Sequence, residues 1–185
     1  MQGQPAVIVL AAGSGSRFRA AGGRSDKLDA AFTRGGTTQT VRQHVLDAVR
    51  ASGLRWHVVE RHHTLHLEQP GMGCSIALGV AATADADGWL ILPADLPLIR
   101  PQSLLAVAQQ LHRSPVVAPL FQGRRGHPVG FQSGCGPALR ALSGDQGARA
   151  LLQQLAVTEL ELDDPGCIAD VDTPELLRLA QELAG

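Results

Sequence analysis

Short apolar runs alternate with amphipathic stretches along this chain. Residues 7–10, 89–92 and 116–120 are continuous apolar runs, which predict buried strands. Residues 40–52 and 173–183 carry apolar side chains at helical spacing and predict helices that face a core. The same patterns predict further strands at residues 56–60, 64–67, 128–131 and 157–162, and further helices at residues 75–82, 101–112 and 147–155.

Three of these helices have recognisable end signals. Gly53 is expected to end the helix at residues 40–52, because glycine favours the conformation found just after helices. Pro101 suits the first turn of the helix it opens, while Thr173 and Pro174 are expected as the cap and first residue of the last helix. Strands that alternate with helices predict an α/β sandwich with a mostly parallel sheet, formed by residues 1–185 as one domain.

The composition narrows the range of partners. The 185 residues are 44% hydrophobic and 18% charged with a net charge of -1, so no overall basic field would attract nucleic acid. No apolar run approaches the roughly 18 residues that span a membrane, and no secretory signal is visible. Cys74, Cys135 and Cys167 are odd in number and widely spaced, which is typical of thiols in a reducing compartment. We therefore expect a cytoplasmic protein that binds neither nucleic acid nor membranes.

The first predicted strand runs into the turn AAGSGSR, residues 11–17. Its glycines allow successive backbone amides to face one anion, and the guanidinium of Arg17 suits a phosphate. The turn lacks the spacing of a P-loop, and Phe18 occupies the third glycine position of a dinucleotide fingerprint. A tight turn without a ligand is the alternative. Ligands of such sheets lie beyond the carboxyl ends of the strands. The residues that follow the other strands therefore decide between an anion-binding turn and a turn without a ligand.

Three carboxylates stand at the ends of predicted elements. Asp95 follows the strand at residues 89–92, and Asp170 and Asp172 precede the last helix. Mg²⁺ usually takes one or two carboxylates together with phosphate oxygens of its substrate. Each carboxylate also has a local alternative, a turn for Asp95 and the helix dipole for the other two. Together with the glycine turn, they favour a metal–nucleotide site.

Other polar side chains are weaker candidates. Lys27, the only lysine, could reach a phosphate at the glycine turn or lie on the surface. His62, His63 and His66 suggest a metal site, but the stretch looks too short for a helix, so exposed or edge-strand histidines are expected. Cys74 is expected to pack rather than to act as a nucleophile.

Seven motifs, in order along the chain, resemble those of the MobA-like nucleotidyltransferases, above all the molybdenum cofactor cytidylyltransferases. They are VLAAGSGSRF, Lys27, GMGCS, PADLPLI, GRRGHPVGF, GDQGAR and DVDTPEL. The resemblance implies a Rossmann-like three-layer fold of the nucleotide-diphospho-sugar transferase type. It also implies transfer of CMP from CTP to the terminal phosphate of molybdopterin carrying molybdenum. The products would be molybdopterin cytosine dinucleotide and pyrophosphate.

The resemblance also implies a role for each motif. The nucleotide would be bound by Leu10, Ala11, Ala12, Gly13, Ser14, Gly15, Gly73 and Ser75, with Ser16 completing the phosphate cradle. The catalytic residues would be Arg17, Lys27 and Asp95, and the Mg²⁺ ligands Asp95 with Asp170 or Asp172. The acceptor would meet His127, Asp145 and Arg149. His127 could equally fix its own loop, and Asp145 could simply cap the following helix.

Two stretches depart from the family pattern. Residues 56–71 look like two strands with a tight connection where the family usually has a helix, and residues 26–40 are more polar than in the family. The base preference rests on Ala12, whose methyl group stands where the guanine-using branch has glycine, so CTP is expected rather than GTP.

Other functions stay open at this point. The chain could use GTP or another phosphorylated acceptor, or it could be a nucleotide-binding accessory protein of molybdoenzyme maturation. In either case a molybdenum hydroxylase or its accessory protein is the expected partner. An NAD-dependent oxidoreductase is disfavoured, because Glu60 lies too far along the chain to be the acidic residue that binds ribose.

Overall fold

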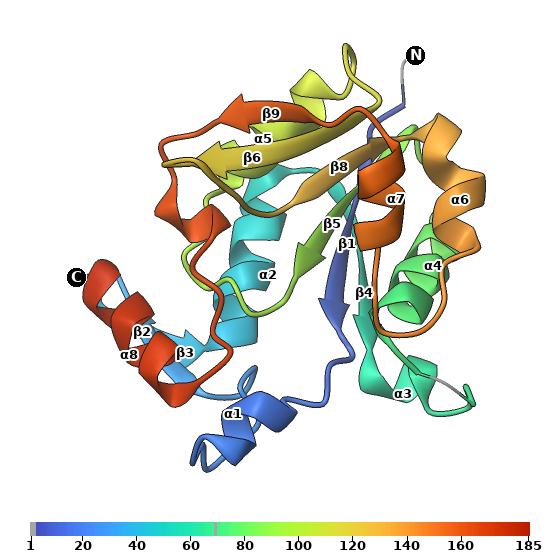
Figure 1. The fold of residues 1–185 in the computed structure, drawn as a ribbon. Helices are drawn as coiled ribbons and strands as arrows, with labels where there is room; N and C mark the ends of the chain where they lie inside the picture. The colour runs from blue at the N-terminus through green and yellow to red at the C-terminus, as the bar shows by residue number, and fades with distance from the viewer. Residues whose placement is uncertain (1–2, 69) are drawn as a thin grey trace.

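A sheet of seven strands forms the centre of the molecule in the computed structural model, which describes residues 3–68 and 70–185 (Figure 1). The strands are β1 (Ala6–Ala11), β4 (Arg55–Glu60), β5 (Gly88–Pro93), β6 (Val116–Phe121), β7 (Arg124–Arg125), β8 (Val129–Gln132) and β9 (Thr158–Glu161). Their order is β4-β1-β5-β8-β6-β7, and β9 pairs with β6. The strands β4 and β5 run parallel to β1, β8 runs antiparallel to both β5 and β6, and β9 runs parallel to β6. The predicted mostly parallel sheet is therefore confirmed.

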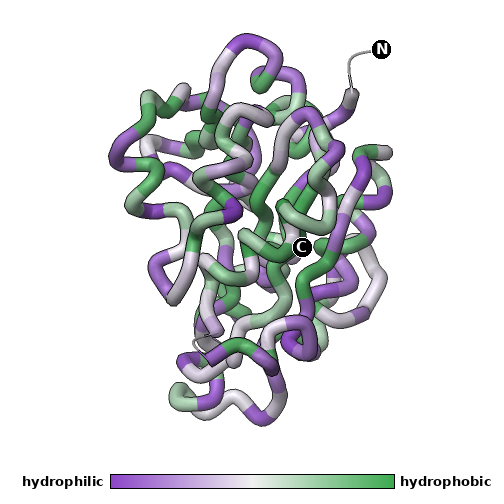
Figure 2. The backbone as a smooth tube through the Cα atoms, turned by 90° about the vertical axis from the view of Figure 1, so that its right-hand side faces the viewer, coloured by the Kyte–Doolittle hydropathy of each residue, from purple (hydrophilic) through white to green (hydrophobic). Residues whose placement is uncertain are grey.

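Helices cover both faces of this sheet. One face packs against α2 (Val41–Ser52) and α5 (Pro101–Gln110), and the other against α4 (Met72–Ala82), α6 (Gly136–Arg140) and α7 (Arg149–Gln154). Alternate side chains of β1 enter the two cores, because successive residues of a strand point to opposite faces. Figure 2 shows hydrophobic segments inside the molecule and hydrophilic ones in the outer loops. The described residues include no helix that is long and apolar enough to span a bilayer.

The helix ends follow the signals read in the sequence. The Thr40 side chain accepts a hydrogen bond from the Gln43 amide at 3.1 Å, and Gly53 ends α2 with a φ of 69°. Thr173 caps α8 (Pro174–Leu183) by accepting from the Leu176 amide at 3.2 Å. These caps confirm the predicted starts of both helices within one residue.

A hairpin of β2 (Ala31–Arg34) and β3 (Thr37–Thr40) lies outside the sheet, where no element was expected. Gly35 and Gly36 connect its strands with φ values of 55° and 77°, as a two-residue hairpin turn requires. The Gly-Gly pair was therefore a readable signal in this polar stretch. The hairpin packs against α8, where the Thr33 amide donates to the Gln181 side chain at 2.8 Å.

The predicted strand at residues 64–67 is wrong. The chain forms one helical turn, α3 (Arg61–Thr64), directly after β4. Glu60 and His63 cap this turn reciprocally, and the Glu60 amide donates to Nδ1 of His63 at 3.0 Å. Leu65 is 72% exposed, so the alternating apolar positions do not enter a core. Among the described strands, β4 has β1 as its one neighbour and forms the edge of the sheet.

The remaining short elements are α1 (Ser16–Ala20), η1 (Ser133–Cys135) and η2 (Pro165–Cys167). Both α1 and η2 lie in the connections that carry candidate site residues.

Candidate functional site

The glycine turn opens onto solvent at the carboxyl end of β1. Gly15 adopts the left-handed conformation, with a φ of 63°, and starts α1. Phe18 is 3% exposed and anchors α1 in the core, so residues 13–16 face outward above the sheet. A Cβ atom added to Gly13 would meet no other atom within 4 Å. The backbone of this turn is therefore open to close approach by a ligand.

Asp95 lies directly beside this turn because β5 is the parallel neighbour of β1. The Ala94 amide donates to the Leu10 carbonyl at 3.0 Å and extends the strand pairing to the residue before Asp95. The Asp95 residue is 8% exposed. Its Oδ1 atom is buried and has no hydrogen-bond partner among the described residues. An unpaired buried carboxylate oxygen is costly unless a cation or donor satisfies it.

Lys27 joins the carboxylates of this region. Leu28, the buried neighbour of Lys27, anchors this segment in the core. The Lys27 side chain extends to the carboxylates of Asp95 and Asp172. Its Nζ atom lies 2.5 Å from Oδ2 of Asp95 and 2.6 Å from Oδ1 of Asp172. Burial lowers the pKa of Lys27, but the two carboxylates outweigh it and raise the pKa above its ordinary value. Lys27 is thus a fixed positive charge at neutral pH.

Asp170 and Asp172 arrive from the opposite end of the chain. Between them, Val171 is fully buried and its amide donates to the Asp95 carbonyl at 2.9 Å. This bond holds the two segments together, and the second oxygen of Asp172 accepts from the Arg17 guanidinium. Burial, and then the charge of Asp95, raise the pKa of Asp170. The carboxylates are therefore close enough to influence one another.

These residues surround one cavity of about 420 Å³. Of the predicted site residues, it is lined by residues 13–17, Lys27, Asp95, His127, Asp170 and Asp172. Five segments that are far apart in the sequence thus meet beyond the carboxyl ends of the parallel strands, as expected for this fold class.

His127 lines the cavity together with Arg124, Arg125 and Gly126 of the same segment. Its amide donates to the Cys167 carbonyl at 2.8 Å, which fixes its backbone to η2. Burial lowers the pKa of His127, although the nearby charge of Asp95 acts in the opposite direction. Its Nδ1 atom is buried without a hydrogen-bond partner among the described residues.

Seven predicted site residues lie outside this cavity, and four of them belong to the start of α4 and to residues 143–149. The amide of Gly73 donates to the Gly144 carbonyl at 2.8 Å, and a Cβ atom at Gly73 would lie 2.6 Å from the Ser143 oxygen. The Ser75 hydroxyl bonds to the Gly71 carbonyl within its own helix at 3.1 Å. Asp145 and Arg149 are exposed and do not line the cavity, and among the described residues of α4 Met72 alone lines it.

Three further predicted residues precede the glycine turn. Leu10 and Ala12 pack against the core on the α4 side, while Ala11 is buried on the other side and lines a second cavity with Gly13. The helix that follows Asp145 begins after Ala148, so Asp145 is not its cap.

Arg124 and Arg125 line the cavity but were not among the predicted site residues, although the motif GRRGHPV contains them. They form β7, and Nε of Arg125 lies 2.6 Å from the Glu159 carboxylate on β9. The sequence signal that could have predicted them is the pair of adjacent arginines close to His127. The described residues contain no group of three or more His, Cys, Asp or Glu arranged to hold a metal ion.

The chain resembles known proteins in sequence. Residues 7–160 match the family model of the MobA-like NTP transferase domain. The purine catabolism protein PucB of Bacillus subtilis (strain 168) is 38% identical over 126 residues, which cover 65% of this chain and 59% of PucB. The match thus spans less than two thirds of the length of that relative.

Solved structures share the fold. Rv0371c from Mycobacterium tuberculosis H37Rv superposes with a TM-score of 0.78 at 23% identity, covering 98% of this chain and 99% of that one. A crystal structure of Rv0371c in complex with manganese superposes with a TM-score of 0.71. Molybdopterin-guanine dinucleotide biosynthesis protein A from Archaeoglobus fulgidus superposes with a TM-score of 0.66 at 16% identity, covering 96% and 97% of the two chains. These likenesses confirm the Rossmann-like fold.

The family model includes the glycine turn, Lys27, Asp95 and His127, which form most of the cavity. The carboxylates from the last connection complete the same site although they lie beyond the matched residues. On these grounds the chain belongs to the family of proteins with a MobA-like NTP transferase domain.

Proposed function

We propose that this protein transfers CMP from CTP to the phosphate of a molybdopterin that carries molybdenum, and releases pyrophosphate. The observation that carries the proposal is the meeting of an open glycine turn, two cations and two carboxylates at one cavity. The cavity volume of about 420 Å³ lies in the range of small-molecule sites.

The chain's own residues would act mainly by charge and position. Backbone amides of residues 13–16 would approach the triphosphate, with Arg17 and Lys27 beside it. Both reactants are phosphates, so fixed positive charges offset their repulsion and stabilise the charge that develops in the transition state. No protein nucleophile is required, because the acceptor phosphate is already ionised and positioning with electrostatics carries phosphoryl-type transfer.

The residues also fit a divalent metal ion, which we propose to be Mg²⁺. Asp95 and Asp172 would hold it, with Asp170 nearby, in exchange for their contacts with Lys27 and Arg17. The unpaired Oδ1 of Asp95 is the oxygen that most needs a cation. Two carboxylates suffice when nucleotide phosphates supply further ligands. When bound, the ion would neutralise the triphosphate and the departing pyrophosphate. The manganese complex of Rv0371c supports the use of a divalent ion.

The acceptor would enter from the side of His127 and β7. This side of the cavity presents the neutral imidazole of His127 and the guanidinium groups of Arg124 and Arg125, which suit a phosphorylated ligand. Asp145 and Arg149 are exposed outside the cavity lining, so they would act on the acceptor only where it extends beyond the cavity past Met72.

The relatives support the choice of acceptor. The Archaeoglobus fulgidus protein is named for molybdopterin and guanine, whereas PucB is named for purine catabolism. We propose a molybdenum hydroxylase or its accessory protein as the partner that receives the product, in the cytoplasm. Ala12 favours CTP, and the name of the archaeal relative makes GTP the second candidate.

Pyrophosphate release tests the proposal. The assay compares CTP, GTP, ATP and UTP with Mg²⁺, each with and without molybdenum-loaded molybdopterin. Release that requires molybdopterin and prefers CTP is expected. Preference for GTP would overturn the assignment of the base, and binding of nucleotide without any release would favour an accessory protein or a different acceptor.

A further inference from the structure

Asp164 is a buried carboxylate that lies outside the cavity. Its residue is 2% exposed, at the start of η2. Oδ2 accepts from the Ser103 hydroxyl at 2.6 Å and from the Arg100 amide at 3.1 Å, while Oδ1 accepts from the Gly166 amide at 2.9 Å. The Arg100 guanidinium lies 3.6 Å from Oδ1 and offsets the negative charge. Such a fully satisfied buried carboxylate is stable in one geometry only.

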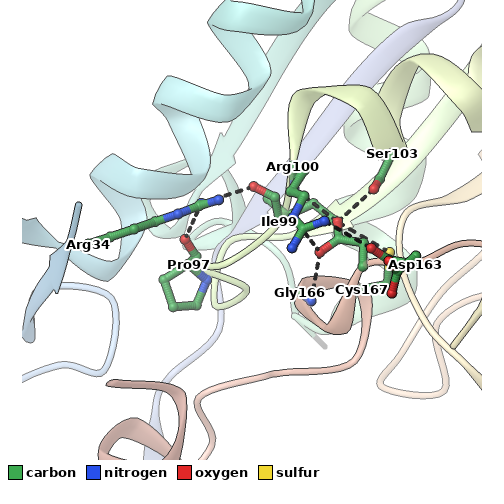
Figure 3. A network of polar contacts seen from close by, with 9 residues as sticks. Arg34, Pro97, Ile99, Arg100, Ser103, Asp163, Gly166 and Cys167 are labelled. Atoms are coloured by element: carbon green, nitrogen blue, oxygen red, sulfur yellow. Dashed lines mark hydrogen bonds and ion pairs between the residues drawn. The ribbon is translucent and has the colours of Figure 1, made fainter. Parts of the chain in front are cut away.

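These bonds connect η2 to the segment that follows Asp95. Figure 3 shows Arg100 and Ser103 at the start of α5 pointing toward Gly166 and Cys167 of η2. The two segments touch closely, since a Cβ atom on Gly166 would lie 2.3 Å from the Leu98 carbonyl oxygen. From the other side, Arg34 donates to the carbonyls of Pro97 and Ile99 at 3.1 and 3.2 Å (Figure 3). The segment after Asp95 is therefore held on both sides.

The same turn also holds the segment of His127. The Cys167 carbonyl accepts from the His127 amide at 2.8 Å, and a Cβ atom on Gly126 would lie 2.2 Å from that oxygen. Cys167 and the following Ile168 line the cavity. A shift of η2 by even one ångström would therefore move the wall of the cavity on which His127 stands.

Three and five residues after the end of η2, the chain reaches Asp170 and Asp172. Val171 fixes the far end of this stretch through its bond to the Asp95 carbonyl. The positions of Asp170 and Asp172 relative to Asp95 thus depend on η2 at one end and on Val171 at the other. Asp164 is the group that fixes η2.

We propose that Asp164 is a positioning residue for the metal site: it fixes η2 against the segment of Asp95 and thereby sets the position of Asp170 and Asp172. The inference rests on the proposed function, since it takes Asp95 and Asp172 as metal ligands. Groups that orient metal ligands from outside the ligand set typically change metal affinity or activity by about 10–100-fold when they are replaced.

The experiment measures Mn²⁺ binding by electron paramagnetic resonance, well below the melting temperature, for the full chain. Asp164→Asn keeps the shape of the side chain but replaces one acceptor oxygen with an NH2 group, which would face hydrogen-bond donors. We expect its Mn²⁺ affinity to fall at least about 10-fold. Its kcat for pyrophosphate release should fall more than its KM for CTP rises. Asp163→Asn is the matched control, because this neighbouring side chain is exposed, and its Mn²⁺ affinity should match the wild type.

Two further variants keep the proposal falsifiable. Ser103→Ala removes only the 2.6 Å bond and should weaken Mn²⁺ binding in the same direction by a smaller factor, so it decides the matter if Asp164→Asn does not fold. An Asp164→Asn protein that folds and binds Mn²⁺ within twofold of the wild type would overturn the inference, and so would an unchanged Ser103→Ala protein. Asp95→Asn distinguishes a failure of the Asp164 inference from a failure of the proposed metal site. If Asp95→Asn leaves Mn²⁺ binding unchanged, the proposed metal site itself is wrong.

Discussion

Two regions carry the predicted site residues, and the structure treats them differently. In the first, the connections after β1 and β5 bring the glycine turn and Asp95 to one cavity, where Lys27 and Asp172 join them. In the second, the start of α4 and residues 143–149 pack against each other and reach the cavity only through Met72. Both regions contain glycines, but Gly13 faces open space, whereas Gly71 and Gly73 allow two backbones to touch.

The difference teaches that a small residue in a motif has two distinct physical meanings. Gly13 leaves room beside the backbone that a ligand can enter, whereas Gly73 leaves room that the Ser143 backbone already fills. Only the first arrangement leaves space beside the backbone for a ligand. Substitutions in the two regions test this difference.

The largest effect is expected at Asp95. Asp95→Asn removes the charge that Lys27 contacts and a proposed metal ligand, so pyrophosphate release should fall at least about 100-fold. Nucleotide binding to the glycine turn should persist, as measured by calorimetry with CTP. Asp85→Asn serves as the control, since this carboxylate forms an exposed ion pair with Arg55. Equal activity of the two variants would contradict the role of the first region.

The two glycines form a matched pair with opposite expected results. Gly73→Ala places a Cβ atom 2.6 Å from the Ser143 oxygen, and such overpacking should lower the free energy of unfolding by about 1–3 kcal/mol, as thermal denaturation can measure. Gly13→Ala meets no neighbouring atom, so its Tm should equal that of the wild type while its Kd for CTP rises. If Gly73→Ala instead kept the stability of the wild type and raised the Kd for CTP, contact with the nucleotide base, and not backbone packing, would explain Gly73.

The smallest effect is expected from two arginines on the acceptor side. Arg124 lines the cavity and Arg149 lies in the second region, at the start of α7. Arg124→Ala should raise the KM for the acceptor by about 10-fold, which is the scale of one charged hydrogen bond. Arg149→Ala should change it by less than about threefold, as surface substitutions do. A larger effect at Arg149 would show that the second region moves during turnover.

Much of the fold was predictable from local pattern. Thr40, Gly53 and Thr173 act within one turn of their own helix, so their signals are complete in the sequence. The wrong prediction of a strand at residues 64–67 has a physical cause as well. The reciprocal cap of Glu60 and His63 started a helical turn, and neither residue stands out in an apolar–polar pattern.

The site was predictable where sheet topology decides it. Asp95 follows a strand next to β1, so its meeting with the glycine turn follows from parallel pairing alone. The contact of Lys27 with Asp172 depends on two irregular connections, and no periodicity encodes it. Arg124 and Arg125 reach the cavity because β7 folds back on β6, a pairing of two residues that is too short to leave a pattern.

The cavity also has a consequence for how a nucleotide arrives. Arg17, Lys27, Arg124 and Arg125 face the carboxylates of Asp95, Asp170 and Asp172 around the same space, and the whole chain carries a net charge of -1. Opposite charges at such short range nearly cancel beyond a Debye length, so the entrance exerts little long-distance attraction on a triphosphate. The rate of nucleotide association should therefore depend weakly on ionic strength, and discrimination among ligands falls to contacts made after entry.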